Sequence, residues 1–153
     1  MSVGCFRIVS VNRLLKRNAV TKLSTIEGIG PAYENKLESA GVTNCEALLE
    51  KGATKKGRIE IASNTDIDMG RILRFVNHAD LCRIKGIGGE YSELLEASGV
   101  DSVPELANRN ADNLAQKMAE VNEQKKLTRM VPSAETITDW IAQAKTLPKV
   151  VTH

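Results

Sequence analysis

The sequence has little that would serve metal binding or redox chemistry. Only 3% of its 153 residues are aromatic, three are cysteine and two are histidine. Cys5, Cys45 and Cys82 have no CxxC spacing, and His78 and His153 lie far from any metal-ligand pattern. We therefore expect no metal, no cofactor, and free bystander thiols in a reducing, cytoplasmic setting.

Long apolar runs and sustained apolar–polar alternation are also absent. No segment approaches the roughly 18 apolar residues of a membrane span, so we expect a soluble protein without a membrane partner. No period-two strand pattern is sustained, and short segments between glycines, prolines and capping residues predict an all-α fold. The 42% hydrophobic content is enough to bury a core.

Basic residues are concentrated at the N-terminus. Residues 1–26 contain no acidic residue and carry Arg7, Arg13, Lys16, Arg17 and Lys22, which leaves the rest of the chain slightly acidic. We interpret residues 1–20 as a basic N-terminal extension. It is either a dispensable extension upstream of the natural start, an arm that contacts a partner, or an organelle-targeting peptide.

A repeated segment divides the remaining chain. Ile26-Glu27-Gly28-Ile29-Gly30-Pro31 returns 58 positions later as Ile84-Lys85-Gly86-Ile87-Gly88-Gly89. The same offset matches Tyr33 to Tyr91, Leu37 to Leu95 and Gly41 to Gly99. The sequence predicts two tandem units of about five short helices each, over residues 21–80 and 81–153, packed as one compact body.

Capping residues locate the helices. Pro31 and Gly41 bound a helix over about 31–40, and Thr43 with Glu46 has capping-box spacing for the next one. Asp68, Ser102 and Ser133 are expected to cap later helices. Gly52 with Thr54, and Asn110 to Asp112, break the chain before the helical segments 58–62 and 114–119.

The aromatic residues fit the core better than a ligand site. Phe75 and Trp140 lie in helical apolar stripes and are expected inside, whereas Tyr33 and Tyr91 are expected to pack beside the glycines with their phenols near the surface.

Each Gly-Ile-Gly segment has the features of an anion site. Its glycines permit positive φ, the isoleucine between them enters the core, and amides at the following helix N-terminus face outward. A phosphate oxygen fits such a place, and a backbone contact would bind DNA or RNA without reading sequence. The candidate residues are Gly28, Ile29, Gly30, Gly86, Ile87 and Gly88.

Charged residues near these segments support two opposing functions. The basic candidates for steering a nucleic acid are Lys55, Lys56, Arg58, Lys85, Lys125, Lys126 and Arg129. Acidic residues follow each segment, namely Glu34, Glu38, Glu93 and Glu96. They favour the alternative, a protein–protein adaptor or scaffold that uses these acidic faces.

The two glycine segments resemble the hairpins of the helix-hairpin-helix superfamily. Residues 21–153 resemble the bacterial domain-of-unknown-function 4332 family, a resemblance carried by Gly52-Ala53-Thr54-Lys55-Lys56-Gly57-Arg58, Asn77-His78-Ala79-Asp80-Leu81, Val121-Asn122-Glu123-Gln124-Lys125-Lys126-Leu127 and Leu147-Pro148-Lys149-Val150-Val151-Thr152. The resemblance implies tandem helix-hairpin-helix units, a role in nucleic-acid binding, and a translation start near Val20. Duplex-binding hairpins usually carry Lys or Arg soon after the second glycine, where this chain has Ala32 and Glu90.

We expect a protein that is not an enzyme. Asp101 comes after a glycine and Asp112 lies at a helix start, and turns and caps account for both residues. No catalytic set of residues is recognisable in the sequence. The preferred function is weak, sequence-independent binding of nucleic acid, with duplex DNA as the first guess. The partner's identity and the oligomeric state stay open.

Overall fold

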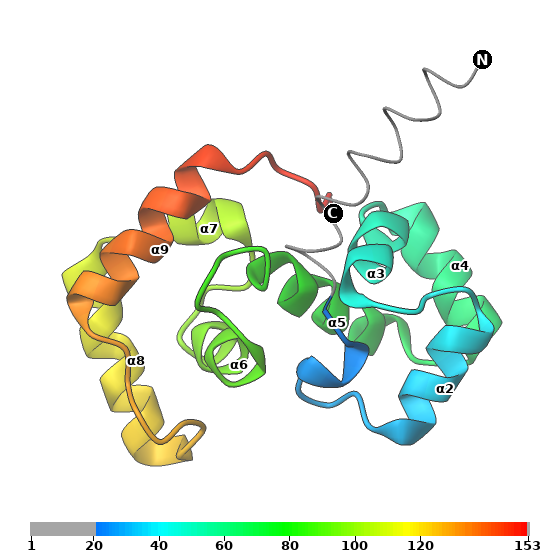
Figure 1. The fold of residues 1–153 in the computed structure, drawn as a ribbon, viewed down its shortest axis with the longest axis horizontal. Helices are drawn as coiled ribbons and strands as arrows, with labels where there is room; N and C mark the ends of the chain where they lie inside the picture. The colour runs from blue at the N-terminus through cyan, green and yellow to red at the C-terminus, as the bar shows by residue number, and fades with distance from the viewer. Residues whose placement is uncertain (1–20, 153) are drawn as a thin grey trace, which may run out of the picture.

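The described part of the chain, residues 21–152, is entirely helical in the computed structural model (Figure 1). One 3-10 turn and eight α-helices follow one another, and residues 21–152 contain no strand: η1 Leu23–Thr25, α2 Pro31–Ser39, α3 Cys45–Gly52, α4 Lys55–Thr65, α5 Met69–Leu81, α6 Gly89–Ala97, α7 Val103–Ala107, α8 Ala111–Lys125 and α9 Ala134–Thr146. The all-α prediction is confirmed. The extension predicted over residues 1–20, with Cys5, lies outside the described residues, as does His153.

Side-chain caps begin most of the helices, and those at Asp68, Ser102 and Ser133 confirm the prediction. Thr54, Asp68, Ser102, Asn110 and Ser133 each accept a hydrogen bond from a backbone N–H two or three residues further on. The cap predicted for α3 was wrong, because Asn44 rather than Thr43 accepts from the Ala47 N–H, at 2.8 Å. Glu46 instead accepts from the Thr21 N–H at 3.0 Å, so it closes no capping box.

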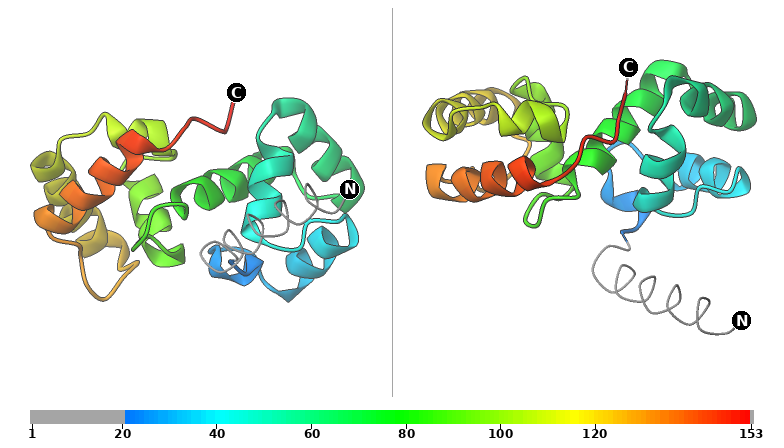
Figure 2. Two further views of the ribbon diagram at one scale, coloured as in Figure 1. Left: turned by 45° about the horizontal axis from the view of Figure 1, so that its top comes forward. Right: turned by 90° about the horizontal axis from the view of Figure 1, so that it is seen from above.

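The buried apolar side chains form two clusters, one on each side of the molecule. The first cluster contains Phe75 and the second contains Trp140; each ring is 1% exposed, which confirms that both aromatics are core residues. Helices α2–α5 surround the first cluster and α6–α9 the second, with α5 running between the two sides (Figures 1 and 2).

The C-terminal segment returns to the first cluster. Val151 is 4% exposed and belongs to that cluster, although α9 packs in the second. The Thr152 N–H donates to the Ala53 carbonyl at 2.7 Å, at the turn between α3 and α4. The end of the described chain therefore ties the two sides together, and Figure 1 shows it lying beside α3.

Each glycine segment rests on the aromatic ring of its own cluster. Gly28 and Gly86 have φ of +97° and +100°, a backbone conformation that side chains with a Cβ rarely adopt. A Cβ on Gly28 would lie 3.3 Å from Phe75, and one on Gly86 would lie 2.9 Å from the Trp140 ring nitrogen. We call residues 26–30 the first glycine turn and residues 84–88 the second glycine turn.

A close contact between Thr25 and Gly89, the residues just before the first glycine turn and just after the second, brings the two turns near each other. A Cβ at this position would overlap the carbonyl oxygen of Thr25, just before the first glycine turn, and would lie 3.7 Å from Glu27 Cγ. The first copy has Pro31 at the equivalent position. A residue without a side chain at the start of α6 is therefore what allows the two turns to meet.

We predict that Gly89→Ala destabilises the protein by about 2 kcal/mol, because the added methyl group must push the two turns apart. Urea unfolding followed by circular dichroism measures the change. Gly88→Ala is the matched control, since nothing lies within 4 Å of a Cβ there, and it should cost less than about 1 kcal/mol. Equal losses in the two variants would show that the turns do not depend on this contact.

Candidate nucleic-acid interface

The first glycine turn presents an uncapped helix N-terminus to solvent. Gly28 and Gly30 are exposed, and Gly30 is the N-cap of α2, without a side chain to pair with the first-turn amides. Ile29 is only 5% exposed, and its N–H donates to the Ile26 carbonyl at 3.1 Å. Ile29 therefore anchors the turn in the core, and outward donors at this site come from the backbone around the two glycines and the start of α2.

The second glycine turn has the same internal geometry but a more crowded setting. Its Ile87 N–H likewise donates to the Ile84 carbonyl at 3.1 Å, and Ile87 is 5% exposed. Gln143 of α9 pairs with the backbone of Lys85 twice, accepting from its N–H at 3.0 Å and donating to its carbonyl at 3.2 Å. Gly88 is half-buried.

The first glycine turn also limits access to the second. The Glu27 side chain comes close to the start of α6, since its Cγ would lie 3.7 Å from a Cβ on Gly89, and an acidic residue near a helix N-terminus disfavours a bound anion. The first glycine turn is thus the more accessible of the two.

Two cations flank Tyr33, in the first turn of α2. Lys36 Nζ lies 6.0 Å from the centre of the Tyr33 ring, and the Arg71 guanidinium carbon lies 5.4 Å from it. The ring also meets Phe75 edge-on, with centroids 5.9 Å apart. Both cations are exposed, so positive charge stands beside Tyr33, in the helix that follows the first glycine turn. Sequence reasoning missed both, because Arg71 reaches this place from the start of α5.

The basic residues predicted from the sequence lie in separate places. Lys55 and Lys56 begin α4 beside the C-terminal end of the chain, whereas the first glycine turn, blue in Figure 1, lies on the opposite side of the same cluster. Lys85 is exposed within the second glycine turn.

The basic residues at the end of α8 do lie near a glycine turn. Lys125, Lys126 and Arg129 are exposed in or beside the α8–α9 loop. This loop contacts the first turn of α6, since Thr128 Oγ1 donates to Glu90 Oε1 at 3.3 Å and Tyr91 Oη donates to the Met130 carbonyl at 3.0 Å. The structure therefore brings this group, and not Lys55 and Lys56, beside a glycine turn.

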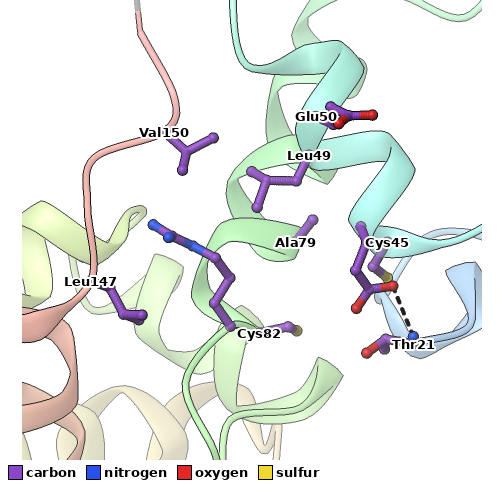
Figure 3. A pocket seen from close by; sticks show the side chains of 10 residues that line it. Thr21, Cys45, Leu49, Glu50, Ala79, Cys82, Leu147 and Val150 are labelled. Atoms are coloured by element: carbon purple, nitrogen blue, oxygen red, sulfur yellow. Dashed lines mark hydrogen bonds between the residues drawn. The ribbon is translucent and has the colours of Figure 1, made fainter. Parts of the chain in front are cut away.

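A mostly apolar cleft of about 500 Å³ lies away from the glycine turns, between α3, α5 and the C-terminal segment (Figure 3). Its lining includes Cys45 and Cys82, both free thiols. Burial, with a smaller effect of Cys82 and Glu46, raises the pKa of Cys45 to about 12. Burial likewise raises the pKa of Cys82 to about 11, against a hydrogen bond with Ser92 that lowers it. Protonated thiols are poor nucleophiles, so neither cysteine is activated at neutral pH.

Residues 27–147 match the protein family described as Domain of unknown function (DUF4332). The chain belongs to this family. No curated protein and no protein of known structure matches it. None of the helices in residues 21–152 is long and apolar enough to cross a membrane, and no group of three or more potential metal ligands occurs in the same part of the chain. This assignment confirms the resemblance to the domain-of-unknown-function 4332 family.

Arg58 of this DUF4332 protein is a structural residue and not part of an exposed basic patch. It is 3% exposed, and its guanidinium donates to the carbonyls of Gly52 at 2.7 Å, Ala53 at 3.1 Å and Thr152 at 2.7 Å. Burial lowers its pKa from the ordinary value, yet arginine stays charged in proteins. The three carbonyls take the place of water around the charge, and a phosphate cannot reach it.

We predict that Arg58→Met lowers the free energy of unfolding by about 3 kcal/mol, because three carbonyl oxygens lose their donor and the C-terminal segment loses its attachment. Lys56→Met, on the exposed start of the same helix, should change it by less than about 0.5 kcal/mol. Chemical denaturation of the two variants measures both values. Similar stabilities would contradict a structural role for Arg58.

A buried polar contact joins α5 to α6. His78 is fully buried, and its Nε2 lies 3.2 Å from Glu96 Oε1, although the ring nitrogen is poorly aligned for a hydrogen bond. Arg74 Nε donates to the same oxygen at 3.0 Å. Burial raises the pKa of Glu96, but His78 and Arg74 together outweigh it, so the net shift is downward. The ionised carboxylate is thus favoured in the folded protein.

We predict that Glu96→Gln costs about 1 kcal/mol at pH 7 and progressively less as the pH falls below 4.5, the ordinary pKa of this carboxyl. Because the pKa of Glu96 is lower in the folded protein than in the unfolded chain, the ionised carboxylate stabilises the fold above the unfolded-state pKa. This stabilisation is lost as the pH falls and the carboxylate of the folded protein becomes protonated. Unfolding at pH 7 and at pH 3 measures the difference. Glu93→Gln is the control, because Glu93 forms no ion pair among the described residues. A cost that does not depend on pH would assign the effect to packing.

Proposed function

We propose that this protein binds nucleic acid weakly and without sequence preference, through the backbone of its first glycine turn. In this proposal the two glycine turns are the hairpins of a tandem helix-hairpin-helix protein. The observation that carries it is the exposed, uncapped start of α2 with Lys36 and Arg71 around Tyr33. Backbone donors and the helix dipole favour a phosphate oxygen, and two nearby cations add attraction that does not depend on the base.

The two glycine turns have different parts in this function. The first is accessible and has cations close by, whereas the second is pinned by Gln143 and faces Glu27. In this proposal a second phosphate contact would be made by Lys85 or by the basic residues of the α8–α9 loop. The protein would therefore grip the backbone at the first turn and steer it with the basic residues near the second.

The adaptor alternative receives less support from the same geometry. Of the acidic residues behind it, only Glu38 is exposed; Glu34 and Glu93 are half-buried. Glu96 is engaged by Arg74 and His78. The acidic surface available to a protein partner is therefore smaller than the sequence indicates.

Gly30→Asp tests the proposal because its effects on folding and on binding have opposite signs. Aspartate is a favourable N-cap, so the variant should be at least as stable as the parent protein. Its carboxylate would accept from the first-turn amides of α2 and repel phosphate, so affinity for a labelled duplex at low salt should fall at least about tenfold. Fluorescence anisotropy measures binding, and Gly30→Ala should retain most of it, because nothing lies within 4 Å of a Cβ there.

A pair of double variants locates the bound surface. Lys36→Ala with Arg71→Ala should weaken binding and reduce the slope of log affinity against log salt by about two, one for each lost phosphate contact. Lys55→Ala with Lys56→Ala removes the same charge from the opposite side and should leave the slope unchanged. No binding of duplex or single strand by the parent protein at low salt would end the proposal.

A further inference from the structure

Met130 is a large apolar side chain that is exposed to solvent. It is 73% exposed, and Ile59, at 51%, is the other large apolar side chain exposed to this degree in residues 21–152. Met130 lies in the α8–α9 loop, and its neighbour Val131 is half-buried against the second cluster. Met130 is therefore exposed although the next residue packs against the core.

Hydrogen bonds hold the backbone of this loop in place. Asn122 pairs twice with Thr128, donating to its carbonyl at 3.0 Å and accepting from its N–H at 2.9 Å. The carbonyl of Met130 accepts from Tyr91 Oη at 3.0 Å, and the Tyr91 ring packs on Trp140 with centroids 5.3 Å apart. These hydrogen bonds, together with the packing of Tyr91 on Trp140, fix the backbone at Met130. The exposure of its side chain therefore follows from a defined loop conformation.

Three exposed basic residues lie in or beside the same loop as the exposed side chain. Lys125, Lys126 and Arg129 are within five positions of Met130 on its N-terminal side, and the exposed Glu135 is five positions after it. The nearby acids offset this charge in part: Glu90 already accepts from the Thr128 hydroxyl, and Glu123 is exposed one turn earlier on α8. An apolar side chain near basic residues fits a partner whose surface carries negative charge and whose interior is apolar, such as a duplex with phosphates outside and stacked bases inside.

We propose that Met130 is a wedge that inserts between stacked base pairs of a bound duplex while Lys125, Lys126 and Arg129 contact its phosphates. Proteins that bend duplexes use single Met, Leu, Ile or Phe side chains in this way, partly unstacking one base step. A lipid surface fits less well, because one methionine buries too little apolar area to hold a protein on a bilayer. This inference rests on the proposed nucleic-acid binding and adds to it a deformation of the duplex.

The experiment uses the full chain and measures affinity and duplex unwinding separately. A closed circular plasmid is relaxed by a topoisomerase in the presence of the protein, and the shift in topoisomers reports unwinding at any sequence. Met130→Ala should lose this shift at protein concentrations that give the same occupancy as the parent protein, and its affinity should fall about tenfold. Ile59→Ala is the matched control, since it removes the other exposed apolar side chain from α4 and should change neither readout.

Three outcomes would overturn the wedge. If the parent protein binds duplex but unwinds none, the wedge is wrong and the proposed function stands. If Met130→Ala unwinds as well as the parent, another residue distorts the duplex. If duplex is not bound at low salt, both proposals fall. Flotation with vesicles of anionic phospholipid is then the second measurement, and binding that Met130→Ala abolishes would assign the loop to a lipid surface.

Discussion

The contact between a left-handed glycine and an aromatic ring holds each glycine turn in place. Gly28 lies on Phe75 and Gly86 lies on Trp140, with positive φ at both glycines. The ring comes from the last helix of the same cluster, so the contact joins the beginning of each copy to its end. A side chain at either glycine would strain the backbone and press on the ring at once. The position of the helix that follows depends on this contact, and so does the direction in which its N-terminus faces.

The two copies share this contact but differ in what surrounds it. Around the first glycine turn, Lys36 and Arg71 converge on Tyr33. At the equivalent place in the second, Tyr91 is tied to the Met130 carbonyl and Gln143 occupies the backbone of Lys85. The two glycine turns thus share one geometry, whereas the polar groups around them differ. In the proposed function one copy binds directly, and the other supports a neighbouring loop.

Local features of the fold could be predicted from the sequence, because their causes are local. Caps such as Asp68 and Ser133 satisfy amides only a few residues away, and the apolar stripe around Trp140 has helical period. The capping box predicted from Thr43 and Glu46 was wrong, because Asn44 caps α3. At the offset of the repeat Asn44 aligns with Ser102, which caps α7, so the repeat itself indicates the correct residue.

Contacts between distant segments could not be predicted in this way. In the sequence Arg58 resembles the exposed lysines before it, and only the fold shows that its guanidinium donates to the carbonyl of Thr152. Likewise, nothing in the residues around Gly89 indicates that Thr25 lies against this glycine. The candidate site was therefore only partly predictable. The glycine turns themselves were evident as a repeat, whereas their cations and their mutual contact depend on tertiary packing.

The attachment of the C-terminal segment has a consequence for synthesis on the ribosome. Arg58 needs a carbonyl that lies 94 residues later in the chain, and Val151 fills a place in the first cluster. While the later helices are still being translated, the earlier ones lack one partner for a buried charge and one piece of their core. The first half of the nascent chain therefore reaches its final structure only after the last of these residues has emerged, so maturation of the two halves is coupled and not strictly sequential.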